Sequence, residues 1–537
     1  MMSVSDVPQI PMNTSFLFLL ADDIGWADFG YNGGIAATPH IDRWAKAHGS
    51  VKMHDFHSGG TVCSPTRASV LTGRNHFRDC VDYVYCCSDM TECVPNFQYA
   101  PQKTFTVADA VRMGRPEAKS IFVGKWHLGS LYNDSEALGG ITSSPTSHGF
   151  DHFNATVGVA PTVTANAQCR VQWNRTVDYG HYGKPTHCSG EGNPGGGGLP
   201  AGCCFNYWAD APGQEHGVVN QSTPTPYDDS YHVTSAFSSF VRDRAGRPFF
   251  AELAFHNCHI PFIASSAARK ACASGLTCTP PAVGAPPYTD AELDYFGCLT
   301  ALDAAVGRVL ATLDEHSYRM DTLVWFTTDN GPEVNCRPSG ICGGSRSRPT
   351  TGGAFTPGSA GLLRGRKRDV WEGGHRVPGI LAWPRYVGAR SLESWATATT
   401  MDFLPTVLEV VGNVSRPAVQ ASWPLDGTSL LPVLRGEALP ARGLAWAYMT
   451  PNVTAGWGYG YRYGRWKMVV GGESCREPDC LRPMLYNLDD DLGERVDLAA
   501  AQPDVLNAML ANFSEWQQSI YRSRKEESQC AAPVRQC

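Results

Sequence analysis

The chain has 537 residues, of which 42% are hydrophobic and 18% are charged, with 55 Gly and 37 Pro. This composition is too apolar for a disordered chain and too poor in Gly and Pro for a collagen-like one, so it predicts a globular protein. Lys and Arg number 44 against 51 Asp and Glu, which leaves a formal net charge of −7. No overall basic field therefore draws the chain to nucleic acid, and any anion must be bound by a local cluster of residues.

Cysteines and glycosylation sequons indicate an oxidising compartment. The 19 cysteines include close pairs at Cys86/Cys87, Cys203/Cys204, Cys336/Cys342 and Cys475/Cys480. Eight Asn-x-Ser/Thr sequons agree with this: Asn13, Asn133, Asn154, Asn174, Asn220, Asn413, Asn452 and Asn512. We expect a protein of the secretory pathway, extracellular or in a lysosome-like compartment. No signal peptide is visible, because the first apolar stretch, Phe16–Ala21, has six residues, and no run reaches the roughly 18 apolar residues of a membrane span.

Four short apolar runs each lead into polar residues of catalytic types. They are 16–21, followed by Asp22 and Asp23; 121–123, followed by Lys125 and His127; 249–255, followed by His256 and His259; and 323–328, followed by Asp329 and Asn330. A helical stripe precedes the last run and consists of Leu299, Leu302, Val306, Val309, Leu310 and Leu313. Helices that alternate with buried strands predict an α/β fold with a mainly parallel sheet, whose ligands gather at the carboxyl ends of the strands. We therefore expect the four polar termini to converge on one edge.

Two regions break this pattern and define the expected domains. Residues 160–230 contain the Gly-rich stretch 192–198, which lacks the Gly-Lys-Ser/Thr of a phosphate-binding loop and is read as a flexible insertion. After about residue 437 the sequence becomes Gly-rich and aromatic, which suits short antiparallel strands. We expect a catalytic domain over 14–437 and a smaller α+β domain over 438–537.

The aromatic residues of the C-terminal region have two possible roles. They are Trp446, Tyr448, Trp457, Tyr459, Tyr461, Tyr463 and Trp466. They could form a sugar-binding platform, but packing of a small sheet on the main domain is the preferred interpretation. Residues 504–516 are predicted to be helical, with Asp504 as the N-cap.

The segment Thr61–Arg74 places a cysteine at the start of a helix. Pro65 suits the first turn and Gly73 suits the end. At a helix N-terminus, with Arg67 on the same face, Cys63 would ordinarily be read as a thiolate nucleophile of lowered pKa. The alternative is one half of a disulfide. Neither explains why this cysteine should accompany carboxylates that repel a thiolate.

Cys63-Ser-Pro-Thr-Arg67, continued by Ala-Ser-Val-Leu-Thr-Gly-Arg74, resembles the signature of the type I sulfatases, in which the cysteine is oxidised by a dedicated enzyme to Cα-formylglycine. Further segments match family motifs in the family's order: Leu20-Ala-Asp-Asp-Ile-Gly25, Gly124-Lys-Trp-His-Leu-Gly129, His259-Ile-Pro261, Thr328-Asp-Asn-Gly331, Lys367 ahead of Glu372-Gly-Gly-His-Arg-Val-Pro378, and Leu485-Tyr-Asn-Leu488 with Gly493-Glu494. The resemblance covers roughly 14–160 and 232–500. It implies an alkaline-phosphatase-like α/β fold, with a large mixed, mostly parallel sheet flanked by helices and a smaller C-terminal antiparallel-sheet domain.

A metal site is expected among the oxygen-bearing residues. Asp22, Asp23, Asp329 and Asn330 offer three carboxylates and an amide oxygen, which suit Ca²⁺ or Mg²⁺ rather than a soft metal. A double Asp at a strand end is by itself usually a solvated loop, but its combination with Asp329-Asn330 favours ligands. The resemblance implies one Ca²⁺ ion rather than Mg²⁺, and adds residue 63 as a ligand.

The resemblance also implies a role for each polar residue. A hydroxyl of the hydrated formylglycine at position 63 would attack sulfur and form a covalent sulfated enzyme, and loss of a proton from the second hydroxyl would expel sulfate. Arg67 would orient that hydroxyl and His127 would be the base. The sulfate oxygens would be surrounded by Lys125, His259 and Lys367, with His259 as the acid for the leaving alcohol and Lys367 assisting.

Other residues have less specific interpretations. His127 could simply pack beside Trp126, although the Lys-x-His spacing after a strand favours catalysis. His54, His57 and His256 match no role and are expected to be structural or to support the site. The basic run 364–368 looks like a nuclear-localisation patch, but is expected to supply Lys367 while its arginines stay in solvent.

The sequence therefore predicts an arylsulfatase-like sulfuric ester hydrolase that converts sulfate monoesters to alcohol and sulfate. The alternatives are a formylglycine-dependent phosphatase or phosphonate monoester hydrolase, and a catalytically silent glycan-binding homologue. The expected partners are a sulfated small molecule or glycan and, during maturation, the formylglycine-generating enzyme. No nucleic acid and no membrane span are expected. Conversion of Cys63 leaves an even number of cysteines for disulfides.

Overall fold

The computed structural model describes residues 9–83, 104–129, 144–156, 229–259, 262, 264–333, 357–412, 423–447, 458–472 and 482–527, together with the backbone of strands at 163–165, 203–211 and 214–221. The Gly-rich stretch 192–198 and the cysteine pairs Cys86/Cys87, Cys336/Cys342 and Cys475/Cys480 lie outside these residues. The expectations for them are not addressed by the structure.

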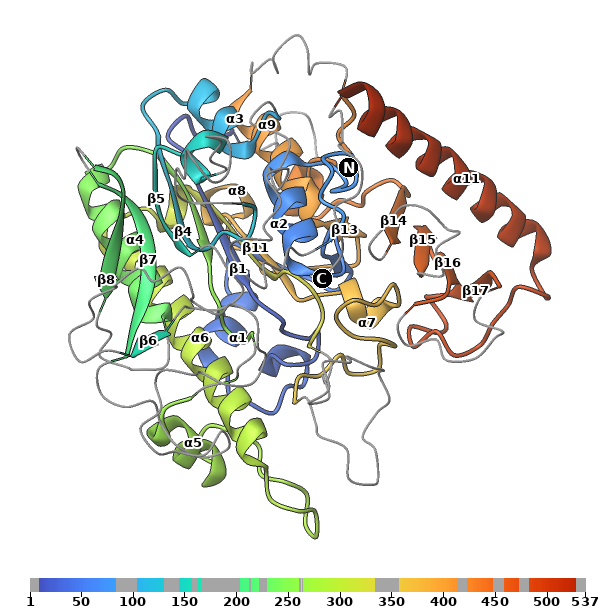
Figure 1. Ribbon diagram of the computed structural model, residues 1–537, viewed down its shortest axis with the longest axis horizontal. Coiled ribbons are helices and arrows are strands. Elements are labelled where there is room, and N and C mark those ends of the chain that lie inside the picture. Colours follow the sequence, from blue (N-terminus) through green and yellow to red (C-terminus); the bar gives the residue numbers. More distant parts are fainter. Residues whose placement is uncertain are drawn as a thin grey trace.

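A large mixed sheet forms the centre of the molecule (Figure 1). Its strands lie in the order β12-β2-β11-β10-β1-β9-β4-β5-β7-β6, with β8 paired to β7. Their bounds are β1 (Ser15–Ala21), β2 (Ser50–Met53), β4 (Lys119–Lys125), β5 (His152–Thr156), β6 (Val163–Ala165), β7 (Cys203–Ala211), β8 (Gln214–Gln221), β9 (Phe249–Ala254), β10 (Thr322–Thr328), β11 (Gly379–Ala382) and β12 (Leu392–Ser394). The central strands β10, β1, β9, β4 and β5 are all parallel to their neighbours in this group. The predicted mixed, mostly parallel sheet is confirmed.

The strand register brings the predicted polar termini together. Ala21 of β1 pairs with Thr328 of β10, and Ala254 of β9 pairs with both Leu20 and Gly124. The residues that follow these four strands therefore emerge at one level, at the carboxyl edge of the sheet. The predicted convergence follows directly from this register.

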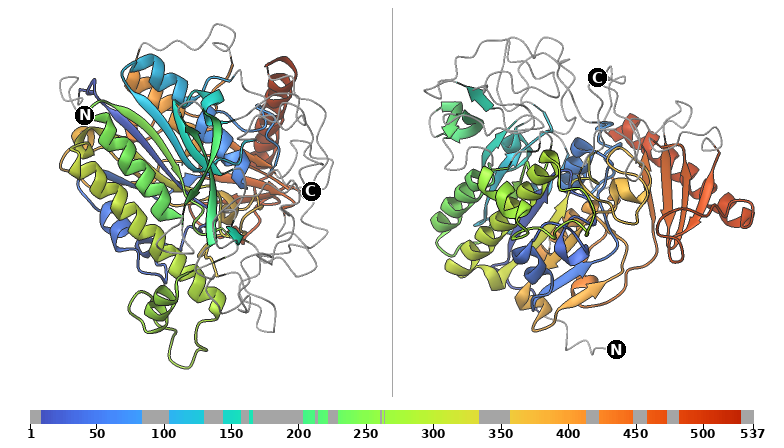
Figure 2. Two further views of the ribbon diagram at one scale, coloured as in Figure 1. Left: turned by 60° about the vertical axis from the view of Figure 1, so that its left-hand side comes forward. Right: turned by 90° about the horizontal axis from the view of Figure 1, so that it is seen from below.

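Helices cover both faces of the sheet (Figures 1 and 2). One face carries α1 (Pro39–Ala45), α4 (Ser230–Arg244) and α6 (Asp290–Glu315), with α5 (Ser266–Ala273) packed on α6; the other carries α2 (Cys63–Thr72), α3 (Val107–Gly114), α8 (Pro384–Val387), α9 (Phe403–Val411) and α10 (Leu431–Leu434). Side chains of β1 alternate between the two cores, with Leu17 and Leu19 on the α6 side and Phe16 and Phe18 on the α2 side.

Helix α6 is the predicted apolar helix, and its stripe lies in the core. Leu299, Val306 and Leu313 are fully buried. Among the described residues α6 alone is long and apolar enough to cross a membrane, and 67% of its apolar window is buried inside the protein.

A second, smaller sheet lies beside the first (Figure 2). Its antiparallel strands are β14 (Gly443–Ala447), β15 (Tyr459–Tyr463), β16 (Trp466–Val470) and β17 (Met484–Asn487), and α11 (Pro503–Arg522) packs against it. Tyr459 stacks on Phe513 of α11 at 4.4 Å, and Trp446 stacks on His375 of the main domain at 3.8 Å. Trp446 and Tyr459 therefore pack the small sheet, in agreement with the preferred interpretation, whereas Tyr463 is exposed and Tyr448 and Trp457 lie outside the described residues.

The start of α11 corrects one prediction. Asp504 is not the N-cap, because the helix begins at Pro503 and Gln502 occupies the cap position. The fixed φ of proline favours the first helical position, so Asp504 falls in the first turn, where its charge still complements the helix dipole.

Short elements complete the described fold. They are β3 (Phe56–His57), β13 (Ala398–Thr399), which pairs with β3, α7 (Glu372–His375), the 3-10 helices η2 (Gly30–Asn32), η3 (Pro145–His148), η4 (Arg319–Asp321) and η5 (Thr400–Asp402), and the π-helix η9 (Ser523–Glu527).

Candidate active site

Helix α2 begins at Cys63, at the carboxyl edge of the large sheet, and ends at Gly73, whose φ of 64° is the left-handed conformation expected at a helix C-terminus. Cys63 is 1% exposed and its thiol is free. The disulfide reading of Cys63 is therefore wrong. Burial, with the Asp329 carboxylate as the next contribution, raises the pKa of the thiol well above its usual value, so the reading as an activated thiolate is also unsupported.

Lys125 links the cysteine to the first aspartate. Its ammonium donates to Asp22 Oδ2 at 2.5 Å and to Cys63 Sγ at 3.3 Å. The thiol in turn lies 3.6 Å from Asp22 Oδ1, within range of a weak donated bond. All three side chains are buried, so solvent screens these contacts little.

Arg67, one helical turn after Cys63, fixes the other side of the site. Its guanidinium donates to Asp329 Oδ2 at 2.8 Å and to the Lys125 carbonyl at 2.7 Å, and it lies 3.5 Å from Asp22 Oδ2. Burial opposes ionisation of Asp329, but the charges of Arg67 and Lys125 outweigh it and lower the pKa of Asp329. Asp329 is thus held as a carboxylate.

The second aspartate joins the remaining predicted residues. Asp23 Oδ2 accepts from Lys367 Nζ at 2.6 Å and lies 3.5 Å from His259 Nε2, while Asp23 Oδ1 accepts from Asn330 Nδ2 at 2.7 Å. Lys367 Nζ lies 3.4 Å from His259 Nε2. A connected set of contacts therefore links residues from four strand termini, the first turns of α2 and the loop that carries Lys367.

His127 is brought to the same edge by the chain after β4. Its side chain is buried, and its carbonyl accepts from Ser64 Oγ of α2 at 2.7 Å. His127 has φ 53° and Asp23 has φ 58°, a left-handed conformation that costs energy for residues with a side chain and is common at functional sites. Gly124 has φ 108°, and a Cβ there would lie 1.9 Å from the Ala254 carbonyl oxygen, so only glycine fits before Lys125.

Glu333 is a residue of this site that sequence reasoning missed. Its carboxylate accepts from Lys367 Nζ at 2.9 Å and pairs with Arg368. These two cations lower the pKa of Glu333 despite its burial. The sequence did contain a signal for this residue, because Glu333 lies four residues after Asp329 in the segment that follows β10.

The arginines beside Lys367 are not in solvent, so that expectation was wrong. Arg368 is 7% exposed and is bound by Glu333. Arg366 is half-buried and donates to the Glu333 carbonyl at 3.0 Å, and the Arg364 guanidinium lies 3.6 Å from the centre of the Trp371 ring. Contacts with Glu333 therefore hold Arg366 and Arg368 inside the protein, beside Lys367.

The donor set fits a hard divalent cation. Ligand atoms of Asp22, Asp23, Cys63 and His259 all lie within 4.8 Å of one another. Asn330 Oδ1 is buried and accepts no hydrogen bond from the described residues. Burial raises the pKa of Asp22 well above its usual value, with Asp329 adding to the effect, and raises that of Asp23 to about 6. A cation would compensate these carboxylates, and their oxygens are the ligands that Ca²⁺ and Mg²⁺ prefer.

The three histidines without an expected role lie outside this contact network. His54 stacks on Trp395 at the surface, and His256 is buried between Asp229 and the Thr156 hydroxyl. His57 contacts His375 at 3.0 Å between nitrogens, in a buried group that also includes Glu372 and Lys467. Lys467 belongs to β16, so this group joins the small sheet to β3 and α7 of the main domain.

The comparisons define the class of protein. The Sulfatase family model matches residues 14–413, so the chain belongs to the sulfatase family. It is a sulfuric ester hydrolase with the fold of that family, as the sequence predicted.

Its relatives place it near the arylsulfatases. The chain is 25% identical to arylsulfatase G of Rattus norvegicus over 94% of its length and 85% of the relative, and 27% identical to arylsulfatase A of Homo sapiens over 92% and 86%. A solved structure, Ps i-CgsB in complex with k-i-k-neocarrahexaose, shares the fold with a TM-score of 0.68 at 19% identity, covering 94% of this chain and 93% of that one.

Proposed function

We propose that the chain hydrolyses sulfate monoesters through Cα-formylglycine formed from Cys63, with one Ca²⁺ ion held by Asp22, Asp23, Asp329 and Asn330. The observation that carries this proposal is the buried free thiol of Cys63 at the start of α2, within 3.6 Å of Asp22 and Lys125. A thiol with a raised pKa among carboxylates is a poor nucleophile. An oxygen nucleophile at this position, formed by oxidation to the aldehyde and hydration, resolves that conflict.

The charges of the site support an anionic substrate. Four carboxylates face four cationic side chains: Asp22, Asp23, Asp329 and Glu333 against Arg67, Lys125, Lys367 and Arg368. A divalent cation adds two positive charges to this balanced set. Those charges suit a sulfate monoester with one negative charge together with an oxygen nucleophile that develops a second.

Each side chain then has a defined task. A bound Ca²⁺ would supply Lewis acidity toward the sulfate oxygens and the nucleophile. Arg67 orients the nucleophile, because it sits one turn along α2 and is itself locked by Asp329 and the Lys125 carbonyl. Lys125 and Lys367 donate to sulfate oxygens, from positions already fixed by Asp22 and by Asp23 with Glu333. Such donors need no reorganisation in the transition state.

Two histidines complete the proton transfers. His259, next to Lys367, protonates the leaving alcohol when sulfur is attacked. His127, which follows β4 and contacts the start of α2, removes the proton from the second hydroxyl of residue 63, so that the aldehyde re-forms and sulfate leaves. The left-handed backbone at His127 fixes where its ring can point.

The natural substrate we propose is a sulfated small molecule or glycan. The arylsulfatase relatives and the saccharide named in the Ps i-CgsB complex support these two classes. Maturation would require the formylglycine-generating enzyme, and the cysteines and sequons support a secretory or lysosome-like compartment. We retain the division into a catalytic domain over 14–437, with the insertion at 160–230, and a smaller domain over 438–537.

The test is turnover of p-nitrophenyl sulfate against p-nitrophenyl phosphate by protein co-expressed with the formylglycine-generating enzyme. Sulfate turnover should dominate, and Cys63→Ala should abolish it while the protein stays folded. Dominance of phosphate turnover would favour the phosphatase alternative. Binding of sulfated glycans without any turnover, with Cys63 unmodified, would favour the catalytically silent one.

A further inference from the structure

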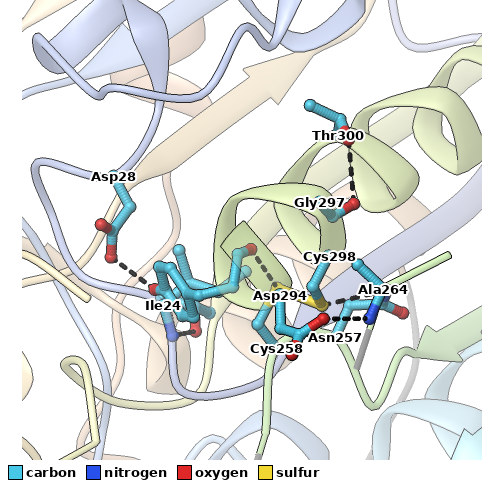
Figure 3. Close-up of a disulfide and its surroundings, with 11 residues drawn as sticks. Ile24, Asp28, Asn257, Cys258, Ala264, Asp294, Gly297, Cys298 and Thr300 are labelled. Carbon is cyan, nitrogen blue, oxygen red and sulfur yellow. Dashed lines mark hydrogen bonds between the residues drawn. A yellow bond between two sulfur atoms is a disulfide. The ribbon is translucent and has the colours of Figure 1, made fainter. Parts of the chain in front are cut away.

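A disulfide joins the active-site edge to the core helix α6. Cys258, which follows β9, is bonded to Cys298 of α6 with a Cα–Cα distance of 5.8 Å and a sequence separation of 40 (Figure 3). Both cysteines are buried, with 1% and 7% exposure. Asn257 Nδ2 lies 3.4 Å from Cys298 Sγ, so the neighbouring side chain also faces the bridge.

The bridge lies one residue before His259. The only backbone between the disulfide and this histidine is the Cys258–His259 peptide, and the His259 amide donates back to the His256 carbonyl at 2.7 Å in a tight turn. The imidazole of His259 lies 3.4 Å from Lys367 Nζ and 3.5 Å from Asp23 Oδ2. The sulfur bridge is therefore the nearest covalent anchor of the ring.

The same peptide segment also fixes the backbone of Asp22. The Cys258 amide donates to the Asp22 carbonyl at 2.7 Å, and the Asp22 amide donates to the Asn257 carbonyl at 2.8 Å. These two bonds continue the pairing of β1 with β9 beyond the ends of both strands. A shift of Cys258 would thus move His259 and Asp22 together.

Helix α6 is a firm anchor for this segment. Three features near its start hold the active-site loops: the Cys298 bridge, the Tyr295 hydroxyl, which donates to Asp28 Oδ2 at 2.7 Å, and Asp294, whose carboxylate accepts from the Ala264 amide at 3.2 Å. Figure 3 shows the bridge and the contact between Asp294 and Ala264. The helix then continues as the buried stripe of the core. The chain on both sides of His259 is therefore tied to α6, through Cys258 before it and Ala264 after it.

We propose that the Cys258–Cys298 disulfide is a positioning device for His259, holding its imidazole where it protonates the leaving alcohol. This inference rests on the proposed role of His259 as the acid. Without the bridge the peptide stays close to Asp22, but the ring loses its nearest link to α6 and keeps only the more distant one through Ala264. A displacement of about 1 Å in a catalytic group can cost about 100-fold in rate.

The effect of removing the disulfide on kcat depends on the leaving group of the ester. An acid contributes most when the departing oxygen is strongly basic, as in phenolate, and little when it is weakly basic, as in p-nitrophenolate. Loss of the bridge should therefore slow phenyl sulfate about 10- to 100-fold in kcat. It should change p-nitrophenyl sulfate by less than about threefold, since that leaving group scarcely needs a proton.

The second disulfide of the described residues provides a matched control. Cys272–Cys278 is equally buried and also packs against α6, but it closes a loop of only six residues at α5. The test compares Cys258→Ala/Cys298→Ala, the volume-restoring Cys258→Ala/Cys298→Val, the control Cys272→Ala/Cys278→Ala, and His259→Ala, each with both esters. We expect kcat to fall more for phenyl sulfate than for p-nitrophenyl sulfate in the two Cys258/Cys298 variants and in His259→Ala. The control variant should show no such difference.

Binding of inorganic sulfate gives a readout without turnover. In a Cys63→Ala background, calorimetry should show weaker sulfate binding by a few-fold to about tenfold when the Cys258 bridge is removed, because one hydrogen-bonding partner is displaced. Removal of the control bridge should leave sulfate affinity unchanged.

The outcomes distinguish the positioning role of the disulfide from the acid role of His259 on which it rests. If His259→Ala shows no leaving-group dependence, the proposed acid role fails. If His259→Ala shows it but the bridge variants lose both esters equally or neither, only the positioning role is overturned. If neither bridge variant folds while the control does, the bridge is a folding requirement, and the positioning role is again overturned.

Discussion

Glu252 should make the protein less stable as the pH rises. This residue lies in the middle of β9, paired in register with Phe18 and Phe122, and is 1% exposed. Its Oε2 accepts no hydrogen bond within the part of the chain that the structure describes. Burial raises the pKa of Glu252 from its usual 4.5 to about 8, and the positive charge of Arg67 offsets this only in part. The native state therefore holds this carboxyl protonated where the unfolded chain would ionise it.

The size of the effect follows from this shift. Below pH 4.5 both states are protonated, and Glu252 has no pH-dependent effect. Between about pH 4.5 and pH 8 the unfolded state has lost a proton that the native state retains, so each pH unit removes about 1.4 kcal/mol of unfolding free energy. The accumulated loss is about 3 kcal/mol at pH 7 and about 5 kcal/mol at pH 8.

The substitution Glu252→Gln keeps the shape of the side chain and removes its ionisable group. The variant should match wild type near pH 4.5 and exceed it by about 3 kcal/mol at pH 7. Denaturant unfolding from pH 4.5 to pH 8 measures this difference, with Glu409→Gln on the exposed side of α9 as a control that should follow wild type. Parallel curves for wild type and Glu252→Gln would refute the reasoning.

Two further predictions concern ion pairs. Asp329→Ala removes a proposed metal ligand and the partner of Arg67, so it should lower both sulfate ester turnover and metal content by elemental analysis; an unchanged metal stoichiometry would show that the cation binds elsewhere. Lys467→Met leaves Glu372 and Glu494 buried without their shared cation, each 2.9 Å from it in the structure. It should destabilise the protein by about 3–5 kcal/mol in thermal unfolding, and a wild-type Tm would contradict that.

Much of the site was predictable because its residues follow recognisable strands. The apolar runs that became β1 and β10 each end directly at a metal-ligand type, Asp22 and Asp329. Parallel pairing then brings those ends together without further information. The start of α2 at Cys63 was likewise readable from Pro65 and Gly73 within ten residues.

Contacts between distant residues were not predictable in this way. The bridge between Cys258 and Cys298 spans 40 residues and has no local sequence signal. Arg368 was read as a solvated residue of a basic run, because only the folded chain brings Glu333 to it. Glu252 was read as part of an apolar strand, and its burial depends on helices, distant in sequence, that cover both faces of the sheet.

The central claim is that residue 63, once converted to formylglycine, performs the chemistry. The most direct measurement compares specific activity toward p-nitrophenyl sulfate with the fraction of residue 63 present as aldehyde, determined by peptide mass spectrometry. Preparations made with increasing amounts of the formylglycine-generating enzyme would cover the range. Activity should rise in proportion to the aldehyde fraction and vanish where residue 63 is entirely cysteine. Full activity from protein in which Cys63 is an unmodified thiol would contradict the account.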